Sequence, residues 1–286
     1  MFVATFFYAL VVEQSLKPGA PVPRLAVSVA TVFVFASAVL FMIYVGRVAY
    51  MMRASTIIAE ICDLASAILE GRCPRDAGPP DTVGELPAAH RVIAARERGM
   101  LVTIAESAVA KQAARAGCIV ALKLRVGDFV PLEAPLFTVH GTPDDLDRLV
   151  DGTCKHLEFG TERTLQQDVA FGFRQLIDMI EKALSPSVND PTTACQALDA
   201  LHELLRRLAT RAPVSEAVRG PDGELRLVMP RYQFGDLLQV TVCETLRYGS
   251  DAAQVPERID RMLADLAEAA HPEHRDAVRR ARELSV

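Results

Sequence analysis

The sequence lacks the excess of positive charge that nucleic-acid-binding proteins carry. It has 31 Lys and Arg against 36 Asp and Glu, a formal net charge of −5, and only 6% of its 286 residues are aromatic. No basic stripe with interleaved aromatic side chains occurs along the chain, and such a stripe is the usual footprint of a nucleic-acid interface. We therefore expect no nucleic acid among the partners of this protein.

Paired cysteines and common catalytic motifs are missing as well. The six cysteines are scattered singly, without a CxxC spacing, which favours reduced thiols in a cytosolic domain over a disulfide scaffold. The chain has no GxSxG, no phosphate-binding GxxxxGK, no GxGxxG after a predicted strand and no HExxH. These absences disfavour the enzyme classes that use such motifs, and the sequence predicts no cofactor.

Metal-ligating residues are not grouped in the sequence either. Cys154 and His156 are near neighbours, and His271 and His274 share one predicted helical face. No four ligands have the spacing of a zinc site, so no metal is predicted.

One long apolar run dominates the first part of the chain. Residues 25–46 contain no charged side chain and are bracketed by arginines. A helix of this length, at about 1.5 Å per residue, covers roughly 33 Å, which is enough for a bilayer core of about 30 Å. Tyr44 and Tyr50 lie at the far end, where aromatic side chains anchor membrane helices. We predict a transmembrane helix over residues 25–50, with the lipid bilayer as a partner.

A second apolar segment, residues 1–12, covers only about 18 Å as a helix and is too short to span a bilayer. It has no positively charged leading region and no small-residue cleavage site, so it is not expected to be a signal peptide. We interpret it as the last half of a membrane helix whose beginning is missing, or alternatively as a re-entrant or interfacial stub. Residues 13–23 form the predicted loop, and residues 1–52 the predicted membrane region.

An amphipathic helix is predicted directly after the span, within residues 53–89. Apolar residues recur at helical spacing from Ile57 to Leu69, with acidic residues among them, and Gly71 is the expected C-terminal cap. A linker rich in proline and glycine follows, over residues 73–87.

A small β-unit is predicted over residues 90–141. The expected elements are strands at 92–95, 100–104, 118–126 and 136–140, and a helix at 105–116. Residues 126–130, followed by Pro135 and Leu136, resemble half of a lipoyl- or biotinyl-type barrel. No lysine lies at the tip of a tight hairpin, because Lys111 falls in the predicted helix and Lys123 in a predicted strand. We therefore expect a structural role for this unit, without a prosthetic group.

Residues 142–286 are predicted to be mainly helical. Helices are expected at 144–157, 163–184, 191–210, 234–248, 256–270 and 272–284, with a short strand at 225–229. The fold class predicted for the whole chain is a membrane-anchored α+β protein.

The stretch over residues 184–194 combines a helix stop with a helix start. Pro186 ends the preceding helix, because proline cannot donate to the helix ladder and restricts the residue before it. Asp190 is the expected N-cap of the next helix, with Pro191 at its first position. The positive end of this helix also suits an anion, although a well-capped connection explains the pattern by itself.

A candidate polar site is predicted at this connection and on the helix before it. Asp168 is expected on the helix face opposite the buried stripe. Arg174 and Asp178 are spaced as i and i+4, which a surface ion pair explains equally well. The residues of the candidate site are Asp168, Arg174, Asp178, Asn189, Asp190, Thr192 and Arg247.

Two runs of residues carry a family resemblance: RTxxQD at residues 163–168 and SPxxNDPxTA at residues 185–194. Together with residues 127–130 and 247–249 they resemble the signature of a bacterial predicted-membrane-protein family, domain of unknown function 2254. Members of that family usually begin with more membrane helices, which implies an N-terminally shortened member here. The family has no established activity that the resemblance would transfer.

Three functions are compatible with these observations. The first is an integral protein of the bacterial inner membrane, as a homo-oligomer, whose cytoplasmic domain senses, gates or scaffolds. The second is a membrane-anchored enzyme with an acidic polar site, and the third is a channel or transporter subunit. Carboxylates clustered in a pocket with raised pKa values would favour the enzyme, and carboxylates used as helix caps and surface pairs would favour the first function. The sequence identifies no small-molecule ligand.

Overall fold

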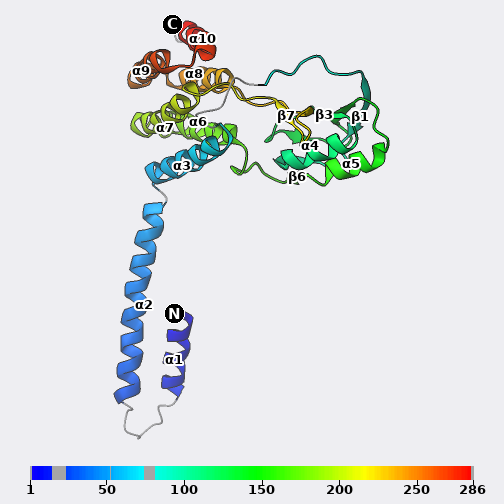
Figure 1. Cartoon of the computed structure of the whole chain (residues 1–286). Helices are drawn as coiled ribbons and strands as arrows, with labels where there is room; N and C mark the ends of the chain where they lie inside the picture. Colours follow the sequence, from blue (N-terminus) through cyan, green and yellow to red (C-terminus); the bar gives the residue numbers. More distant parts are fainter. Residues whose placement is uncertain (1, 15–23, 52, 74–80, 285–286) are drawn as a thin grey trace. The chain divides into compact units, whose positions relative to one another are not determined.

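The structure, a computed structural model, describes residues 2–14, 24–51, 53–73 and 81–284 (Figure 1). It consists of two compact units, Met1–Ile57 and Ile58–Val286, which are described one after the other. Of the loop predicted at residues 13–23, Glu13 and Gln14 belong to a helix and residues 15–23 lie outside the described residues, as do residues 74–80 of the predicted linker.

The first unit is a pair of apolar helices. α1 covers Phe2–Gln14 and α2 covers Arg24–Met51, and the two run antiparallel and in contact (Figure 1). The Thr5 and Ser37 hydroxyl oxygens lie 2.9 Å apart in a buried hydrogen bond between them. Since an unpaired hydroxyl is costly in hydrocarbon, such a bond holds helices together inside a bilayer.

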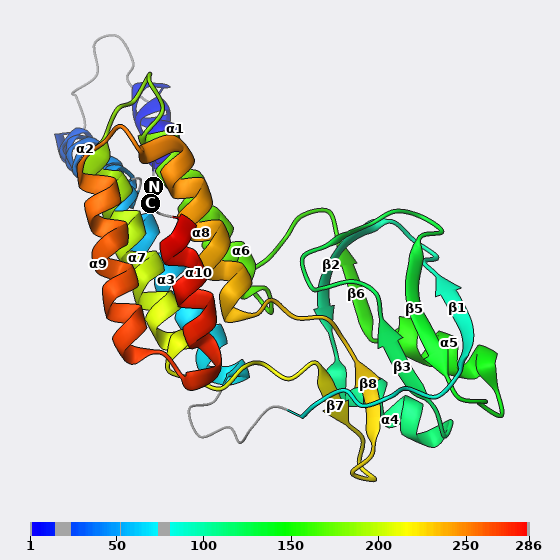
Figure 2. The same ribbon diagram turned by 90° about the horizontal axis from the view of Figure 1, so that it is seen from above.

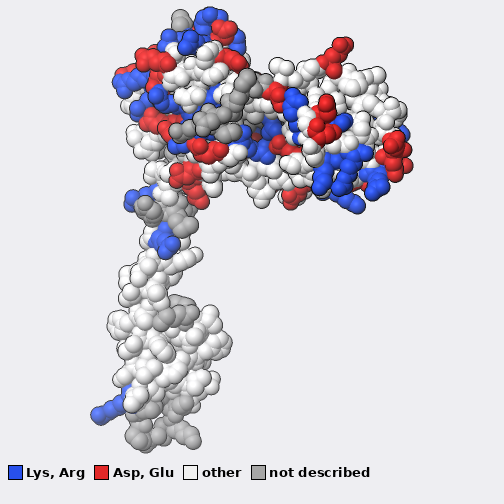
Figure 3. All heavy atoms as spheres, viewed as in Figure 1, with Lys and Arg blue, Asp and Glu red and all other residues white. Residues whose placement is uncertain are grey.

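The helix α2 has the length and composition of a membrane span over Arg24–Val48. Its large apolar side chains are mostly exposed, with Phe35 at 69% and Ile43 at 61%. Figure 3 shows the surface of this unit almost without Lys, Arg, Asp or Glu between the helix ends. Such a surface is unfavourable in water and suits lipid, in agreement with the predicted span at residues 25–50.

The second unit contains a helical core. Its members are α3 (Ala54–Arg72), α6 (Val169–Ala183), α7 (Pro191–Ala209), α8 (Phe234–Gly249), α9 (Gln254–Ala269), the 3₁₀ turn η1 (Pro272–His274) and α10 (Arg275–Leu284). α7 contacts α6, α8 and α9 and is central to this core (Figure 2). The helix predicted at residues 191–210 is α7, and its apolar face is buried: Ala194, Ala197, Leu198, Leu201, Leu204, Leu205 and Leu208.

The amphipathic helix predicted after the span is confirmed as α3. Ile58, Ile61, Ala65 and Leu69 form its buried stripe. Gly71 is not the cap, because the helix continues to Arg72. Its C-terminal carbonyl groups are bonded by a side chain from a distant part of the chain, which is described below.

The rest of the second unit is a sheet region of eight short strands and two helices. The strands are β1 (Ala89–Ala94), β2 (Gly99–Ile104), β3 (Ile119–Leu122), β4 (Phe129–Val130), β5 (Pro135–His140), β6 (Leu157–Gly160), β7 (Ala217–Arg219) and β8 (Leu225–Val228). The helices are α4 (Glu106–Arg115) and α5 (Leu146–Cys154).

These strands form two open sheets. One has the order β1-β5-β3-β8-β7 and the other the order β4-β2-β6. Every pair is antiparallel except β3 with β8, in which Val120 lies opposite Leu227. Side chains of both sheets, with Val109 of α4 and Leu149 of α5, share one apolar core.

The barrel-like arrangement expected for residues 90–141 is not confirmed. The described strands form no closed barrel, and β1 and β2, although successive, belong to different sheets. The sheets also take in β6, β7 and β8, which come later in the chain. Lys111 lies in α4 as expected, but Lys123 follows the end of β3.

Two of the predicted helices begin too early. Residues 144–157 contain α5 only from Leu146, because the Asp145 carboxylate accepts the Arg148 N–H at 3.0 Å and caps the helix there. Residues 163–184 contain α6 only from Val169, because Asp168 has the same role. A side-chain cap fixes where a helix starts, and apolar periodicity alone does not reveal it.

Candidate functional site

Asp168 is buried at the N-terminus of α6, with 3% of the residue exposed. Its Oδ1 accepts the Phe171 N–H at 3.0 Å, and its Oδ2 accepts the Arg163 Nε–H at 2.8 Å. Burial raises the pKa of this carboxyl group, although the Arg163 charge and hydrogen bond act in the opposite direction. The predicted exposed position of Asp168 is therefore wrong: it caps the helix and lies inside the protein.

Gly127 allows the chain to pass directly beside this carboxylate. Its φ is +95°, and a Cβ atom added there would collide with the Asp168 carboxylate and lie 2.9 Å from a guanidinium nitrogen of Arg163. Any side chain would push this ion pair apart, so only glycine fits at this position.

Gln167 joins the same segment to the sheet region. Its Oε1 accepts the Ile104 N–H at 3.1 Å, and its Nε2 donates to the Ile104 carbonyl oxygen at 3.3 Å. The side-chain amide of Gln167 thus forms the two hydrogen bonds that a neighbouring strand would otherwise form with Ile104, at the end of β2. Buried backbone N–H and C=O groups need such partners. The RTxxQD run is consequently a junction between the helical core and the sheet region.

Arg174 lies in a separate, acidic cluster on α6 and α8. Its Nε donates to Asp178 at 2.6 Å, its guanidinium group is 3.1 Å from the Glu181 carboxylate, and it also pairs with Glu244. Burial by itself would lower the pKa of Arg174, but the bonds and charges of Asp178 and Glu244 outweigh it and raise the pKa. This guanidinium group is permanently charged and neutralised by its neighbours.

The connection between α6 and α7 has the predicted geometry. Asp190 caps α7, since its Oδ1 accepts the Thr193 N–H at 3.1 Å and its Oδ2 accepts the Thr193 hydroxyl at 2.6 Å. These bonds hold the pKa of Asp190 below its ordinary value. Asn189 has a positive φ of 48°, a conformation that asparagine adopts more readily than most residues.

The remaining candidate residues are on the surface. Thr192 is exposed at the start of α7, and Arg247 is exposed on α8 with its guanidinium carbon 5.9 Å from the centre of the Tyr248 ring. The direct contacts of the candidate site therefore fall into three sets, around Asp168, Arg174 and Asp190. Within the described residues, no hydrogen bond or ion pair joins one set to another.

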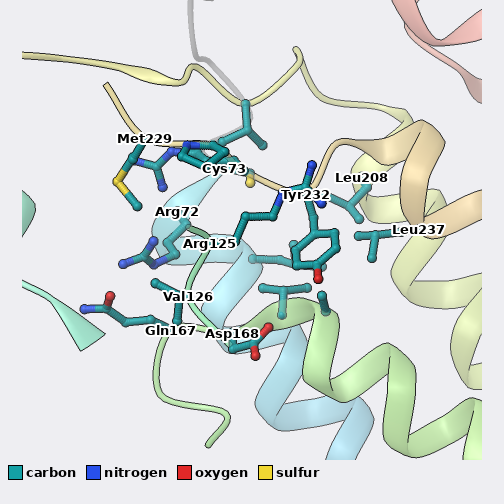
Figure 4. A pocket seen from close by; sticks show the side chains of 16 residues that line it. Arg72, Cys73, Arg125, Val126, Gln167, Asp168, Leu208, Met229, Tyr232 and Leu237 are labelled. Carbon is teal, nitrogen blue, oxygen red and sulfur yellow. The ribbon is translucent and has the colours of Figure 1, made fainter. Parts of the chain in front are cut away.

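A cavity of about 80 Å³ lies where the helical core meets the sheet region (Figure 4). Asp168 is the one candidate residue that lines it. The other polar lining residues are Arg72, Arg125, Gln167, Arg231 and Tyr232. The three arginines and the tyrosine are not among the predicted site residues, because they lie at a helix end and in connections that have no periodic pattern.

The sequence of the chain matches the model of a known protein family. The family model described as "Predicted membrane protein (DUF2254)" matches residues 1–265. The chain belongs to this family. The resemblance deduced from the RTxxQD and SPxxNDPxTA runs is thereby confirmed.

Members of the family with similar sequences come from mycobacteria. The uncharacterized proteins Rv1290c of Mycobacterium tuberculosis and Mb1321c of Mycobacterium bovis are each 28% identical to this chain over 281 residues. The match covers 94% of this chain and 54% of each relative, so the chain spans about half the length of these relatives. No solved structure matches the chain significantly.

The family has no known activity, so the site has to be interpreted from its own chemistry. In the part of the chain that the structure describes, no three His, Cys, Asp or Glu side chains are placed together as metal ligands. Two charged groupings stand out among the described residues, the arginine-lined cavity and the Arg174 cluster, and of these two the cavity has space for a ligand.

Proposed function

We propose that this family member is an integral protein of the bacterial inner membrane whose cytoplasmic domain, residues 58–286, is a sensing module. In this proposal the domain binds a ligand or partner and transmits the event to the membrane through α3. The module would act either by gating a neighbouring subunit or as a scaffold.

The observation that carries the proposal is the position of α3. This helix begins at Ala54, while the membrane helix α2 ends at Met51. Its buried stripe is part of the helical core, and its last turn, with Leu69, Arg72 and Cys73, lines the cavity. In the proposal, a change in the cavity acts on α3, the first helix after the membrane span in the sequence.

Arg211 makes the cavity end of α3 rigid. Its side chain is 2% exposed, and one guanidinium nitrogen donates to the carbonyl oxygens of Leu69, at 2.8 Å, and of Cys73. A second nitrogen pairs with Glu70 at 2.5 Å. A buried cation that bonds the last carbonyl groups of a helix stabilises that end strongly.

The cysteines support the cytoplasmic orientation. All six are free thiols, and burial raises the pKa values of Cys62, Cys73, Cys118 and Cys154, which keeps these thiols protonated and unreactive. Unpaired cysteines are typical of reducing compartments. A C-terminal reporter enzyme that is active only outside the cytoplasm tests the orientation and should stay inactive.

We propose further that the protein works as a homo-oligomer in the bilayer. The support is the single helix of span length among the described residues, because one span cannot by itself enclose a pathway for gating. A channel or transporter subunit requires the same assembly.

A membrane-anchored enzyme is the second candidate, and one observation favours it: Asp168 is a carboxyl group with raised pKa at the wall of a cavity. Against it, both Asp168 oxygens are engaged by Phe171 and Arg163, and Asp190 is engaged as a cap. Asp178 is half-exposed in an ion pair. Most of the predicted acidic site thus serves caps and surface pairs, which supports the sensing module.

The experiment is hydrogen exchange of the full chain in lipid nanodiscs, comparing Arg211→Gln with Arg207→Gln. Arg211 and Arg207 both pair with Glu70, but Arg207 is one-third exposed and bonds no helix end. Loss of the buried bonds should cost about 2 kcal/mol locally, or roughly 30-fold faster exchange. If α3 transmits a change from the cavity towards the membrane, the faster exchange in Arg211→Gln extends along the whole helix, from Arg72 to the first turn at Ala54. Faster exchange confined to the last turn of α3 contradicts the proposal.

A further inference from the structure

The arginines of the cavity are not equally neutralised. Glu106 is 3.0 Å from Arg72 and 2.5 Å from Arg231, so a single carboxylate serves two guanidinium groups. Arg125 has no carboxylate within ion-pair distance anywhere in the described chain, and its guanidinium carbon lies 4.5 Å from the centre of the Tyr232 ring. Stacking on an aromatic ring holds the guanidinium plane in place and leaves its N–H groups free.

The carboxylates near the cavity are already engaged by other groups. Asp168 is bonded by Arg163 and Phe171. Asp128 accepts the backbone N–H of Arg125 at 2.8 Å, which leaves the Arg125 side chain untouched. Within the described residues, the Arg125 guanidinium group therefore has no carboxylate bonded to it.

A second donor is also without a partner. The Nε–H of Arg231 is buried and makes no hydrogen bond in the described part of the structure. Burying a donor without an acceptor is unfavourable, so a native structure normally supplies an acceptor. Arg125 and Arg231 line the same cavity: within the described chain the first forms no ion pair, and the second has an unbonded Nε–H.

The size of the cavity limits what that acceptor can be. Its volume of about 80 Å³ exceeds the roughly 10–15 Å³ that one water needs. It is well below the roughly 300–1,000 Å³ of a pocket for a drug-sized molecule. Space of this size fits a phosphate or a short carboxylate, and apolar residues such as Val126, Val169 and Leu237 cover the remaining wall.

We propose that this cavity binds a small oxyanion, a phosphate or carboxylate group, through the guanidinium groups of Arg125 and Arg231. Guanidinium groups match oxyanions with two parallel hydrogen bonds, and the apolar wall strengthens these bonds by excluding water. The oxyanion then lies beside Arg72 at the end of α3. As an identification of the ligand, this inference rests on the proposed sensing function.

The test is isothermal titration calorimetry of the purified full chain with inorganic phosphate, acetate and glycerol phosphate. Arg125→Gln removes the charge but keeps the backbone N–H to Asp128. Lys123→Gln is the matched control, because Lys123 is an exposed cation in the same connection and does not line the cavity. We expect at least one of the three anions to bind, and its affinity to fall at least about tenfold in Arg125→Gln, or ~1.4 kcal/mol, and to be unchanged in Lys123→Gln.

The three anions distinguish the sources of the ligand. Binding of phosphate identifies free inorganic phosphate, and binding of acetate alone identifies a carboxylate. Binding of glycerol phosphate alone identifies the head group of a larger molecule. All three outcomes support the proposal if they depend on Arg125.

Two results overturn the proposal: no binding of any of the three anions, or binding that Arg125→Gln leaves unchanged. Arg125→Lys covers the case in which the glutamine variant does not fold. It retains the charge but not the planar fork, so it should weaken binding severalfold, and unchanged affinity contradicts the proposal. Calorimetry does not report on α3, and the exchange experiment above uses no ligand, so the ligand and the sensing function can fail independently.

Discussion

The helical core and the sheet region of the second unit bury their apolar residues in different ways. The helices α6 and α7 are successive in the chain and pack together, as do α9 and α10. In the sheet region, β3 (Ile119–Leu122) lies beside β8 (Leu225–Val228), which comes more than 100 residues later. These helix pairs are neighbours along the chain, whereas this strand pair joins distant segments.

The chain passes between these regions several times. After α3 it forms β1 to β6, returns to the helical core for α6 and α7, adds β7 and β8 to the sheet, and ends with α8 to α10. The order of elements therefore does not separate the regions, and the junction at residues 163–168 is one of the crossings. The comparison indicates that the sheet region depends on a few single residues at such crossings, whereas the helical core depends on repeated apolar positions.

The largest expected effect is at Gly127. Gly127→Ala should lower the free energy of unfolding by about 2–4 kcal/mol, because it adds backbone strain and forces the Asp168–Arg163 pair apart. The measurement is urea unfolding in detergent. Gly223→Ala is the control: its φ is +79°, but nothing lies within 4 Å of the added atom, so only the backbone cost of about 1–2 kcal/mol applies. Equal effects at the two glycines would contradict the proposed contact with Asp168.

A smaller effect is expected at Gln167. Gln167→Ala removes both hydrogen bonds to Ile104 and should cost about 2 kcal/mol, since two backbone groups lose their partners. The neighbouring Gln166 is exposed, and Gln166→Ala should change stability by less than about 0.5 kcal/mol. Hydrogen exchange at β2 locates the effect, and an unchanged Ile104 amide would show that this junction does not hold the strand.

The smallest effect compares two N-caps, buried Asp168 and half-buried Asp190. The pKa of Asp168 is raised, so its contribution to stability is full below the ordinary pKa of about 3.9 and is lost as the pH rises through the raised value. The pKa of Asp190 is lowered, so its contribution is full above about 3.9 and is lost as the pH falls through the lowered value.

Asp168→Asn and Asp190→Asn should therefore change the pH dependence of Tm in opposite directions. As the pH is lowered from about 6 to 3, the Tm of the natural chain should rise relative to that of Asp168→Asn and fall relative to that of Asp190→Asn. Each change should be a few degrees at most. Thermal unfolding of the three proteins over this range is the measurement. Parallel curves for the two variants would mean that burial does not distinguish the two caps.

Several features could be deduced from the sequence alone because they depend on residues close together in the chain. The uncharged run of α2 determines the membrane span, and the apolar spacing of α7 determines which of its residues are buried. Asp190 and Pro191 determine the start of α7. Each of these signals lies within one helix, where sequence separation and spatial distance correspond.

Only the tertiary structure decided the surroundings of Asp168, the pairing of β3 with β8, and the cavity with its three arginines. Asp168 looked like an exposed helical residue because the groups that enclose it include Gly127, from a connection about forty residues earlier. Arg125 and Arg231 line the same cavity, and both come from connections with no periodic pattern. The sequence by itself determined the span, the long helices and the Asp190 cap, because their energetics are local. The candidate site was decided by long-range packing, which brings together residues that no local pattern relates.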